Sequence, residues 1–101
     1  MTQRYLYVLN IRPGTQAAYK KAHDEMPDEL RELYRSVGMS NYTVFLNGTQ
    51  VIAYCEVDGD AQQAFAAVGD HPLEHAFAAT LADVIVDNPD VPPPVAEVWR
   101  L

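Results

Sequence analysis

Residues 14–37 read GTQAAYKKAHDEMPDELRELYRSV, and the rest of the predicted fold is arranged around this helical stretch. Thr15 is expected to supply a capping hydroxyl, and the charged face of the stretch is expected to be solvated. Pro27 lacks an amide hydrogen, so we expect the helix to kink or to restart there. Inward-facing side chains recur at spacings of three and four, which places them on one face of the helix: Tyr19, His23, Met26, Leu30, Leu33 or Tyr34, and Val37.

Two polar-tipped side chains, Tyr19 and His23, lie on the predicted core face one helical turn apart. A single histidine in such a place is most simply explained as a buried imidazole that is hydrogen-bonded to a neighbour. Two polar tips aimed inward at the same level need partners, and a polar pocket would provide them. Both interpretations, a satisfied core residue and a pocket residue, stay open at this point.

The segments around the helix predict the fold class. Asn47-Gly48 predicts a hairpin, Asp60 is expected to cap a short helix that runs to Val68, and another helical run covers roughly Leu73–Val86. Four segments alternate between two faces, as strands do: Gln3–Ile11, Ser40–Leu46, Gln50–Val57 and Val95–Leu101. The resulting order predicts an α+β, ferredoxin-like βαββαβ fold, with a four-stranded antiparallel sheet, helices on one face and residues 1–101 as a single domain.

The first strand is apolar on both of its faces. Tyr5 and Tyr7 point one way, whereas Leu6 and Val8 point the other way. Helices on one face of the sheet would leave the other row in water. The simplest remedy is a second sheet supplied by another copy of the chain, so we expect a homodimer.

Composition narrows the kind of partner. The chain has 101 residues and a formal net charge of −7, which argues against nucleic-acid binding and favours a neutral small molecule over an anionic one. No apolar run is long enough to cross a bilayer, and the N-terminus shows no signal-peptide pattern. The single cysteine, Cys55, permits no intrachain disulfide and fits a reducing cytoplasm. Its apolar strand predicts a buried, inert thiol.

The run His71-Pro72-Leu73-Glu74-His75 matches the H-x-x-E-H spelling of a zinc-peptidase motif. That chemistry needs both imidazoles on one helical face, whereas Pro72 is expected to start the helix and to leave His71 outside it. We therefore expect no metal site. Glu56, late in its strand, is expected at an exposed position, with the pocket as the alternative.

The aromatic residues divide into core and pocket groups. Most residues of the first group are explained as core side chains: Tyr5, Tyr7, Phe45 and Trp99. The remaining group could converge, because the first helix packs on the sheet that contains Tyr42: Tyr19, His23, Tyr42 and Phe77.

Several short motifs follow one another along nearly the whole chain: Tyr19-Lys20-Lys21-Ala22-His23, Pro27-Asp28-Glu29-Leu30, Asn41-Tyr42, Asp83-Val84, Asn88-Pro89-Asp90 and Glu97-Val98-Trp99. In this order and at this spacing they resemble the L-rhamnose mutarotase family. The resemblance implies a dimeric α/β barrel built from two ferredoxin-like sheets, and a small neutral sugar as the substrate. Anomer exchange needs no metal or redox cofactor.

By position, the resemblance implies that His23 is the proton-donating histidine and that Tyr19 and Tyr42 contact the sugar. The family places two adjacent tryptophans against the sugar, where this chain has Phe77 and Ala78. The change removes stacking area and hydrogen-bond donors and enlarges the pocket. The implied activity is the interconversion of the α and β anomers of L-rhamnose or a similar deoxy sugar, with the imidazole as general acid and base.

Two alternative hypotheses assume the same fold and a different function. In the first, a roomier site with one histidine and two tyrosines guides the isomerisation or cyclisation of a different, less polar metabolite. In the second, the chain is a non-catalytic small-molecule binding or assembly module, and His23 is a satisfied core residue.

Overall fold

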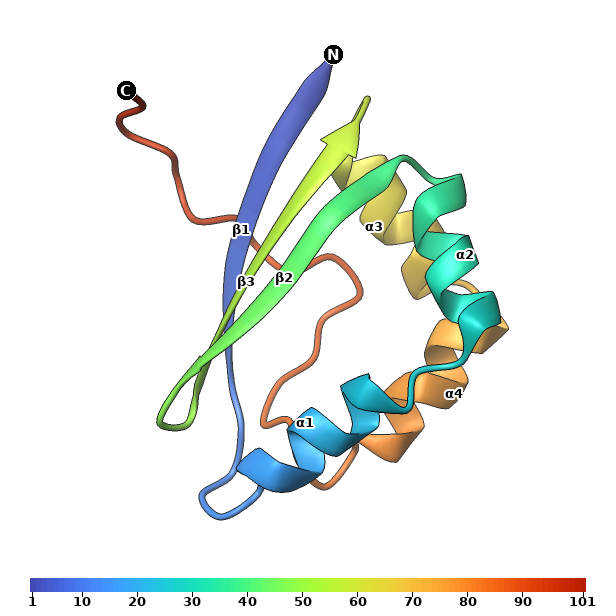
Figure 1. The fold of residues 1–101 in the computed structure, drawn as a ribbon, viewed down its shortest axis with the longest axis vertical. Coiled ribbons are helices and arrows are strands. Elements are labelled where there is room, and N and C mark those ends of the chain that lie inside the picture. Colours follow the sequence, from blue (N-terminus) through green and yellow to red (C-terminus); the bar gives the residue numbers. More distant parts are fainter.

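The computed structural model describes all of residues 1–101 (Figure 1). Three strands pair in the order β1-β3-β2, with both pairs antiparallel, and the helices cover one face of this sheet. The elements follow along the chain as β1 (Thr2–Asn10), α1 (Gln16–Asp24), α2 (Asp28–Ser36), β2 (Met39–Asn47), β3 (Gln50–Asp58), α3 (Ala61–Gly69) and α4 (Pro72–Thr80). The predicted ferredoxin-like α+β plan is confirmed up to its last strand, and so is the hairpin between β2 and β3.

The predicted long helix is interrupted at Pro27, where the chain starts again as α2. Pro27 has φ −61° and ψ 145°, an extended conformation, and it occupies the N-cap position of α2. Its ring and its missing amide hydrogen are compatible with a helix start and not with a helix interior. Of the predicted inward face, Tyr19 and Leu30 are buried and His23 is half-buried. The expected restart at the proline is therefore confirmed.

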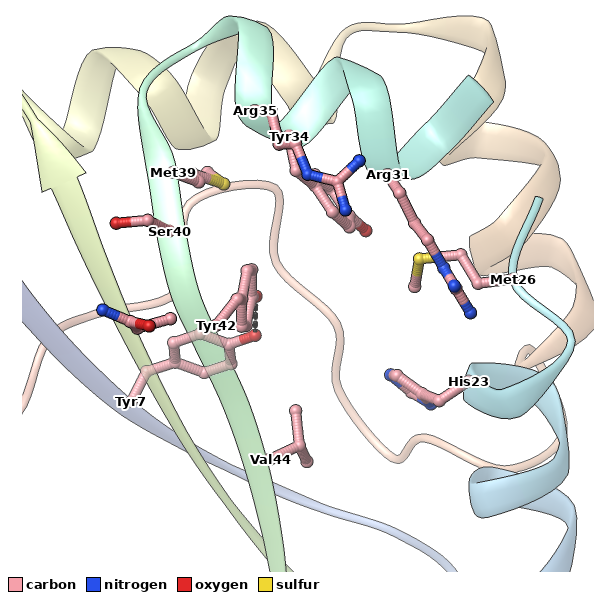
Figure 2. Close-up of a pocket in the computed structure, with 11 residues that line it drawn as sticks. Tyr7, His23, Met26, Arg31, Tyr34, Arg35, Met39, Ser40, Tyr42 and Val44 are labelled. Carbon is pink, nitrogen blue, oxygen red and sulfur yellow. Dashed lines mark hydrogen bonds between the residues drawn. The ribbon is translucent and has the colours of Figure 1, made fainter. Parts of the chain in front are cut away.

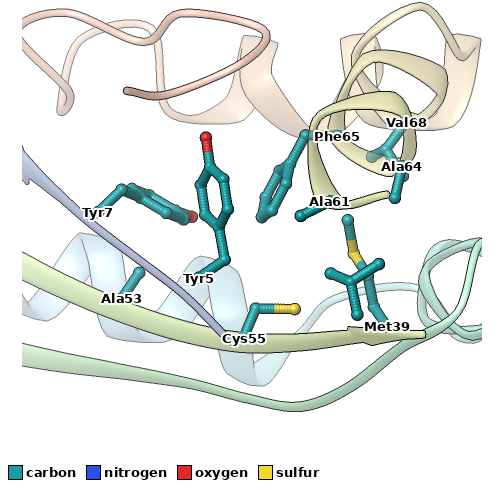
Figure 3. Packing of buried hydrophobic residues seen from close by; sticks show 10 residues of the cluster. Tyr5, Tyr7, Met39, Ala53, Cys55, Ala61, Ala64, Phe65 and Val68 are labelled. Atoms are coloured by element: carbon teal, nitrogen blue, oxygen red, sulfur yellow. The ribbon is translucent and has the colours of Figure 1, made fainter. Parts of the chain in front are cut away.

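Two apolar clusters lie between the sheet and the helices. The larger cluster joins Tyr5 and Tyr7 of β1 and Cys55 of β3 to Phe65 and its neighbours on α3 (Figure 3). The smaller cluster fixes α1 at the far end of the sheet through one buried ring, that of Tyr19, and its neighbours: Ile11, Val51, Leu81, Val84 and Ile85. Burial raises the pKa of the Cys55 thiol to about 11, which agrees with the predicted inert thiol.

Residues 95–101 form no strand, which corrects the fourth strand predicted at Val95–Leu101. One backbone hydrogen bond, 2.7 Å from the Val95 amide to the Leu6 carbonyl, joins this segment to β1. Pro92-Pro93-Pro94 has no amide hydrogens with which to start a ladder. Trp99 is 73 % exposed because the tail leaves the body of the chain (Figure 1), so its assignment to the core was wrong.

The helix α4 ends at Thr80, whereas the sequence predicted a helical run to about Val86. The chain turns after Thr80 and then bonds to the end of β1. The Arg12 amide donates to the Val84 carbonyl and the Val86 amide donates to the Asn10 carbonyl, each over 2.9 Å. Pairing with a strand requires extended backbone, and this competing partner ends the helix.

The sheet face turned away from the helices carries an apolar patch that is open to solvent. Val8 and Phe45 both pair with Ile52 across the sheet, so the three side chains share this face. Phe45 is 57 % exposed and Val8 is 43 % exposed, which corrects the assignment of Phe45 to the core. The apolar character of both strand faces is as predicted. None of the helices has the length and hydropathy that crossing a bilayer requires.

Gly38 and Gly48 provide a matched test of the fold, because both have positive φ, at 90° and 62°. A β-carbon on Gly38 would lie 2.8 Å from the Asp58 carbonyl oxygen, whereas one on Gly48 would meet nothing within 4 Å. We expect Gly48→Ala to lower the free energy of unfolding by about 1–2 kcal/mol through left-handed strain alone. Gly38→Ala should lower it by roughly 1–3 kcal/mol more, because backbone must also move. Urea unfolding measures both, and equal losses would contradict the close approach.

Candidate active site

The four pocket residues predicted from the sequence come together in the structure. Tyr19 and His23 project from α1, Tyr42 from β2 and Phe77 from α4, and all four line one inner pocket of about 60 Å³. The His23 ring lies 4.4 Å from the Tyr19 ring and meets the Phe77 ring edge-on at 5.2 Å, centroid to centroid. Three elements that are far apart in sequence therefore build one site.

A larger cavity of about 310 Å³ opens beside the inner pocket, between α1 and α2 on one side and β2 on the other (Figure 2). Met26, Met39 and Val44 give it apolar walls, and Arg31 and Arg35 of α2 also line it. The two spaces share part of their lining: Tyr7, His23, Tyr34 and Tyr42. A ligand in the large cavity would therefore meet the same imidazole and phenols that line the inner pocket.

The imidazole of His23 is held in one tautomer by its own helix. Its Nδ1 lies 2.9 Å from the Tyr19 carbonyl oxygen, and a carbonyl only accepts hydrogen bonds, so Nδ1 carries the hydrogen. The other nitrogen, Nε2, has no protein partner, and no fully buried side-chain nitrogen or oxygen in the chain lacks one. Nε2 is therefore accessible, and in the neutral ring it presents a lone pair to the site.

Burial sets the protonation of His23. Desolvation lowers the pKa of the imidazole below its ordinary value of 6.5, while the hydrogen bond to the Tyr19 carbonyl and the nearby Asp24 carboxylate act in the opposite direction. At neutral pH the ring is therefore mainly uncharged, so Nε2 can accept a proton and return it, as a general base and acid requires.

The phenols form two hydrogen-bonded pairs. The hydroxyl groups of Tyr7 and Tyr42 bond to each other (Figure 2), and the Tyr34 hydroxyl donates to Glu74 Oε2 over 2.8 Å. Desolvation raises the pKa of Tyr7 to about 12 and raises the pKa values of Tyr34 and Tyr42 further. At neutral pH these phenols stay protonated, so they act as hydrogen-bond donors and acceptors and not as bases.

The sequence analysis did not assign three of the residues that line the site to it: Tyr7, Tyr34 and Glu74. Tyr7 is buried in the core as predicted, but its hydroxyl reaches the cavity. Tyr34 stood on the predicted inward face of the helix, which was the available signal. Glu56 was correctly placed outside the pocket, because its carboxylate accepts hydrogen bonds from Asn41 and Tyr54 at the solvent-exposed face of β3.

The H-x-x-E-H run has capping and packing contacts. Pro72 begins α4 as predicted, and His71 is its N-cap, where Nδ1 accepts from the Leu73 amide over 3.1 Å. His75 Nε2 donates to the Gly69 carbonyl over 2.6 Å, and Glu74 accepts from Tyr34. The chain has no group of three or more histidine, cysteine, aspartate or glutamate side chains arranged to hold a metal ion.

Fold and site together define a ferredoxin-like α+β protein whose candidate small-molecule site is built from one histidine and several tyrosines. The L-rhamnose mutarotase family model matches residues 4–101. An L-rhamnose mutarotase from Jannaschia sp. is 31 % identical over 102 residues, covering 98 % of each chain. This chain therefore belongs to the L-rhamnose mutarotase family.

Solved structures agree with this assignment. A crystal structure of an L-rhamnose mutarotase from Formosa agariphila superimposes with a TM-score of 0.81 at 27 % identity, over 98 % of each chain. The tetracenomycin F2 cyclase from Streptomyces glaucescens, a type-II polyketide cyclase, superimposes with a TM-score of 0.73 at 19 % identity, over 98 % of each chain. The second likeness shows a shared fold.

The position of Asp24 predicts how the His23 pKa responds to substitution. Asp24 raises the pKa of His23 and is paired with Lys20 over 2.6 Å. Asp24→Asn removes the negative charge and leaves the lysine unpaired, so the His23 pKa should fall further below 6.5. NMR titration of the imidazole measures the change, and low ionic strength enlarges it. Asp28→Asn is the control, and an unchanged His23 pKa in Asp24→Asn would contradict the electrostatic account.

Proposed function

We propose that this chain interconverts the α and β anomers of a neutral sugar, L-rhamnose or a similar deoxy sugar, with His23 as the general acid and base. The observation that supports this most directly is the accessible Nε2 of His23, in a ring whose other nitrogen is fixed by the Tyr19 carbonyl. Membership of the mutarotase family agrees with it. The enzyme class is isomerase, and the chemistry needs no metal or redox cofactor.

Anomer exchange requires the sugar ring to open. A proton must reach the ring oxygen while another leaves the anomeric hydroxyl. The freed hydroxyl then attacks the opposite face of the aldehyde and closes the ring. In the proposed mechanism, His23 transfers the proton at the ring oxygen, while Tyr19 and Tyr42 orient the sugar through their hydroxyls. General acid–base catalysis of this kind contributes on the order of 10²–10⁴ in rate, or roughly 3–5 kcal/mol.

The shape of the site supports a small, partly apolar sugar. The cavity of about 310 Å³ lies within the range of small-molecule pockets and offers the methyl group of a deoxy sugar an apolar wall at Met26, Met39 and Val44. Phe77 keeps an aromatic edge at the site, while Ala78 lines the inner pocket without filling it. These two positions would set which sugar is preferred.

A second candidate is the isomerisation or cyclisation of a less polar metabolite. The apolar walls of the cavity favour it, as does the presence of phenylalanine and alanine where the family resemblance implies two tryptophans. Such a ligand would use the same imidazole as a proton-transfer group, and it would make little use of the hydrogen-bonding phenols.

Saturation-transfer NMR on a panel of sugars tests the main proposal. The wild-type protein should accelerate α/β exchange of L-rhamnose or a related deoxy sugar, and His23→Ala should lose about 10²–10⁴ of that acceleration. Glu25→Gln, an exposed change after α1, is the control and should keep it. Saturable sugar binding without faster exchange would favour a binding module, and indifference to all sugars with an apolar ligand co-purifying would favour the second candidate.

We further propose that the protein is a cytoplasmic homodimer whose apolar sheet faces pack together. The outer face, with Val8 and Phe45 exposed, supports this proposal, as does the exposed tail that carries Val98 and Trp99. An apolar patch of this kind on a chain of net charge −7 is unusual unless it is covered. One buried cysteine without an intrachain partner is consistent with a reducing compartment.

Sedimentation tests the assembly. We expect a dimer at micromolar concentration, and we expect Phe45→Glu to shift it to monomer, because a charge would be buried between the sheets. Gln63→Glu adds the same charge on the helical side of the fold and should leave the dimer intact. A wild-type chain that sediments as a folded monomer would remove this proposal.

A further inference from the structure

Glu74 is a carboxyl group that the proposed mechanism leaves unused. It lies on α4 one turn before Phe77 and Ala78, so the three side chains share one face of the helix. Glu74 lines the inner pocket of about 60 Å³ together with His23, and also an adjoining hollow of about 90 Å³. A half-buried carboxyl therefore lies in the same small pocket as the imidazole.

One oxygen of this carboxyl is occupied and the other is free. Oε2 accepts the hydrogen bond from the Tyr34 hydroxyl over 2.8 Å, which fixes the group from α2. Oε1 has no protein partner, and since no fully buried side-chain oxygen in the chain lacks one, Oε1 is accessible. Half-buried polar atoms at a pocket wall are where a ligand forms its orienting hydrogen bonds.

The neighbouring residues leave room for such a ligand atom. Ala78 lines both the inner pocket and the adjoining hollow, and its methyl group fills little of either. The inner pocket has space for about two water molecules, so one end of a sugar can enter it while the rest occupies the large cavity. The anomeric end would then lie between an imidazole and a carboxyl.

We infer that Glu74 is a second catalytic residue, which exchanges the proton of the anomeric hydroxyl while His23 exchanges the proton of the ring oxygen. The inference rests on the proposed function and deepens it. The buried phenols stay protonated at neutral pH, which leaves this carboxyl as the pocket's other proton acceptor.

The step balances with no other reactant. The protonated His23 ring gives its Nε2 proton to the ring oxygen as the bond between that oxygen and C1 breaks. The Glu74 carboxylate takes the proton of the anomeric hydroxyl, and the electron pair of that O–H bond forms the C1 carbonyl. After rotation about the C1–C2 bond, the hydroxyl that carries the former ring oxygen attacks the other face of C1 and returns its proton to His23. The Glu74 carboxyl then protonates the carbonyl oxygen, which becomes the new anomeric hydroxyl.

The surroundings of Glu74 determine how this pair depends on pH. Burial raises the pKa of the Glu74 carboxyl above 4.5 and Asp90 acts in the same direction, while the Tyr34 hydrogen bond and His75 of its own helix lower it. The pKa of His23 is lowered from 6.5. The reactive pair holds one proton in total, so activity should fall at acid pH, where both groups are protonated, and at alkaline pH, where both are deprotonated.

The test is the pH profile of kcat/KM for sugar anomer exchange, measured from pH 4 to 8 on the wild type and on Glu74→Gln. The amide keeps an acceptor for the Tyr34 hydroxyl and preserves the packing, but it cannot take up a proton. We expect a loss of about 100-fold in kcat/KM and the disappearance of the acid limb. Glu29→Gln, an exposed glutamate on α2, should retain the wild-type rate and both limbs.

A second variant separates catalysis from structure. Tyr34→Phe removes the hydrogen bond that lowers the Glu74 pKa, so the acid limb should move to higher pH, a shift that a purely structural role would not produce. Circular dichroism confirms that each variant is folded. If wild type is active, His23→Ala is inactive and Glu74→Gln keeps the wild-type rate and profile, the inference is overturned while the proposed function stands. If wild type accelerates no sugar, both fail.

Discussion

The absence of one amide hydrogen, at Pro27, determines where the site can form. A continuous helix over residues 14–37 would carry all its inward side chains along one line. The break starts α2 afresh from an extended residue, so α1 and α2 approach the sheet as separate helices with a cavity between them and β2 (Figures 1 and 2). His23 then enters this space from one helix and Tyr34 from the other. Backbone chemistry at a single position thus shapes the space in which the proposed proton transfers take place.

Burial, more than charge pairing, adjusts the titrating groups of the site. Desolvation is the largest cause of the lowered His23 pKa, of the raised Glu74 pKa and of the raised pKa values of the phenols. Burial shifts acids upward and bases downward, so it brings a carboxyl and an imidazole toward each other in pKa while it moves phenols out of range. A water-poor pocket of this composition therefore separates the groups that can exchange protons from those that only form hydrogen bonds.

Patterns local in sequence predicted much of this architecture. Spacings of three and four placed Tyr19 and His23 on one face, and the alternation around Tyr42 placed it on the sheet face that they meet. The pairing of Tyr34 with Glu74 could not be predicted in this way, because it depends on α2 and α4 packing together across forty residues. The last strand failed for a related reason, since alternation at Val95–Leu101 signals an extended chain but does not supply the neighbour that would pair with it.

Cys55 lies in the centre of the main core, with no exposed surface, and it is the single thiol of the chain. A reagent that attacks thiolates can reach it only when the sheet separates from α3, because the sulfur lies under that layer (Figure 3). Its labelling rate therefore reports how often the sheet and α3 separate, and it is insensitive to fraying of the tail or loops. The single native thiol thus reports the opening of the main core, and no reporter group needs to be introduced.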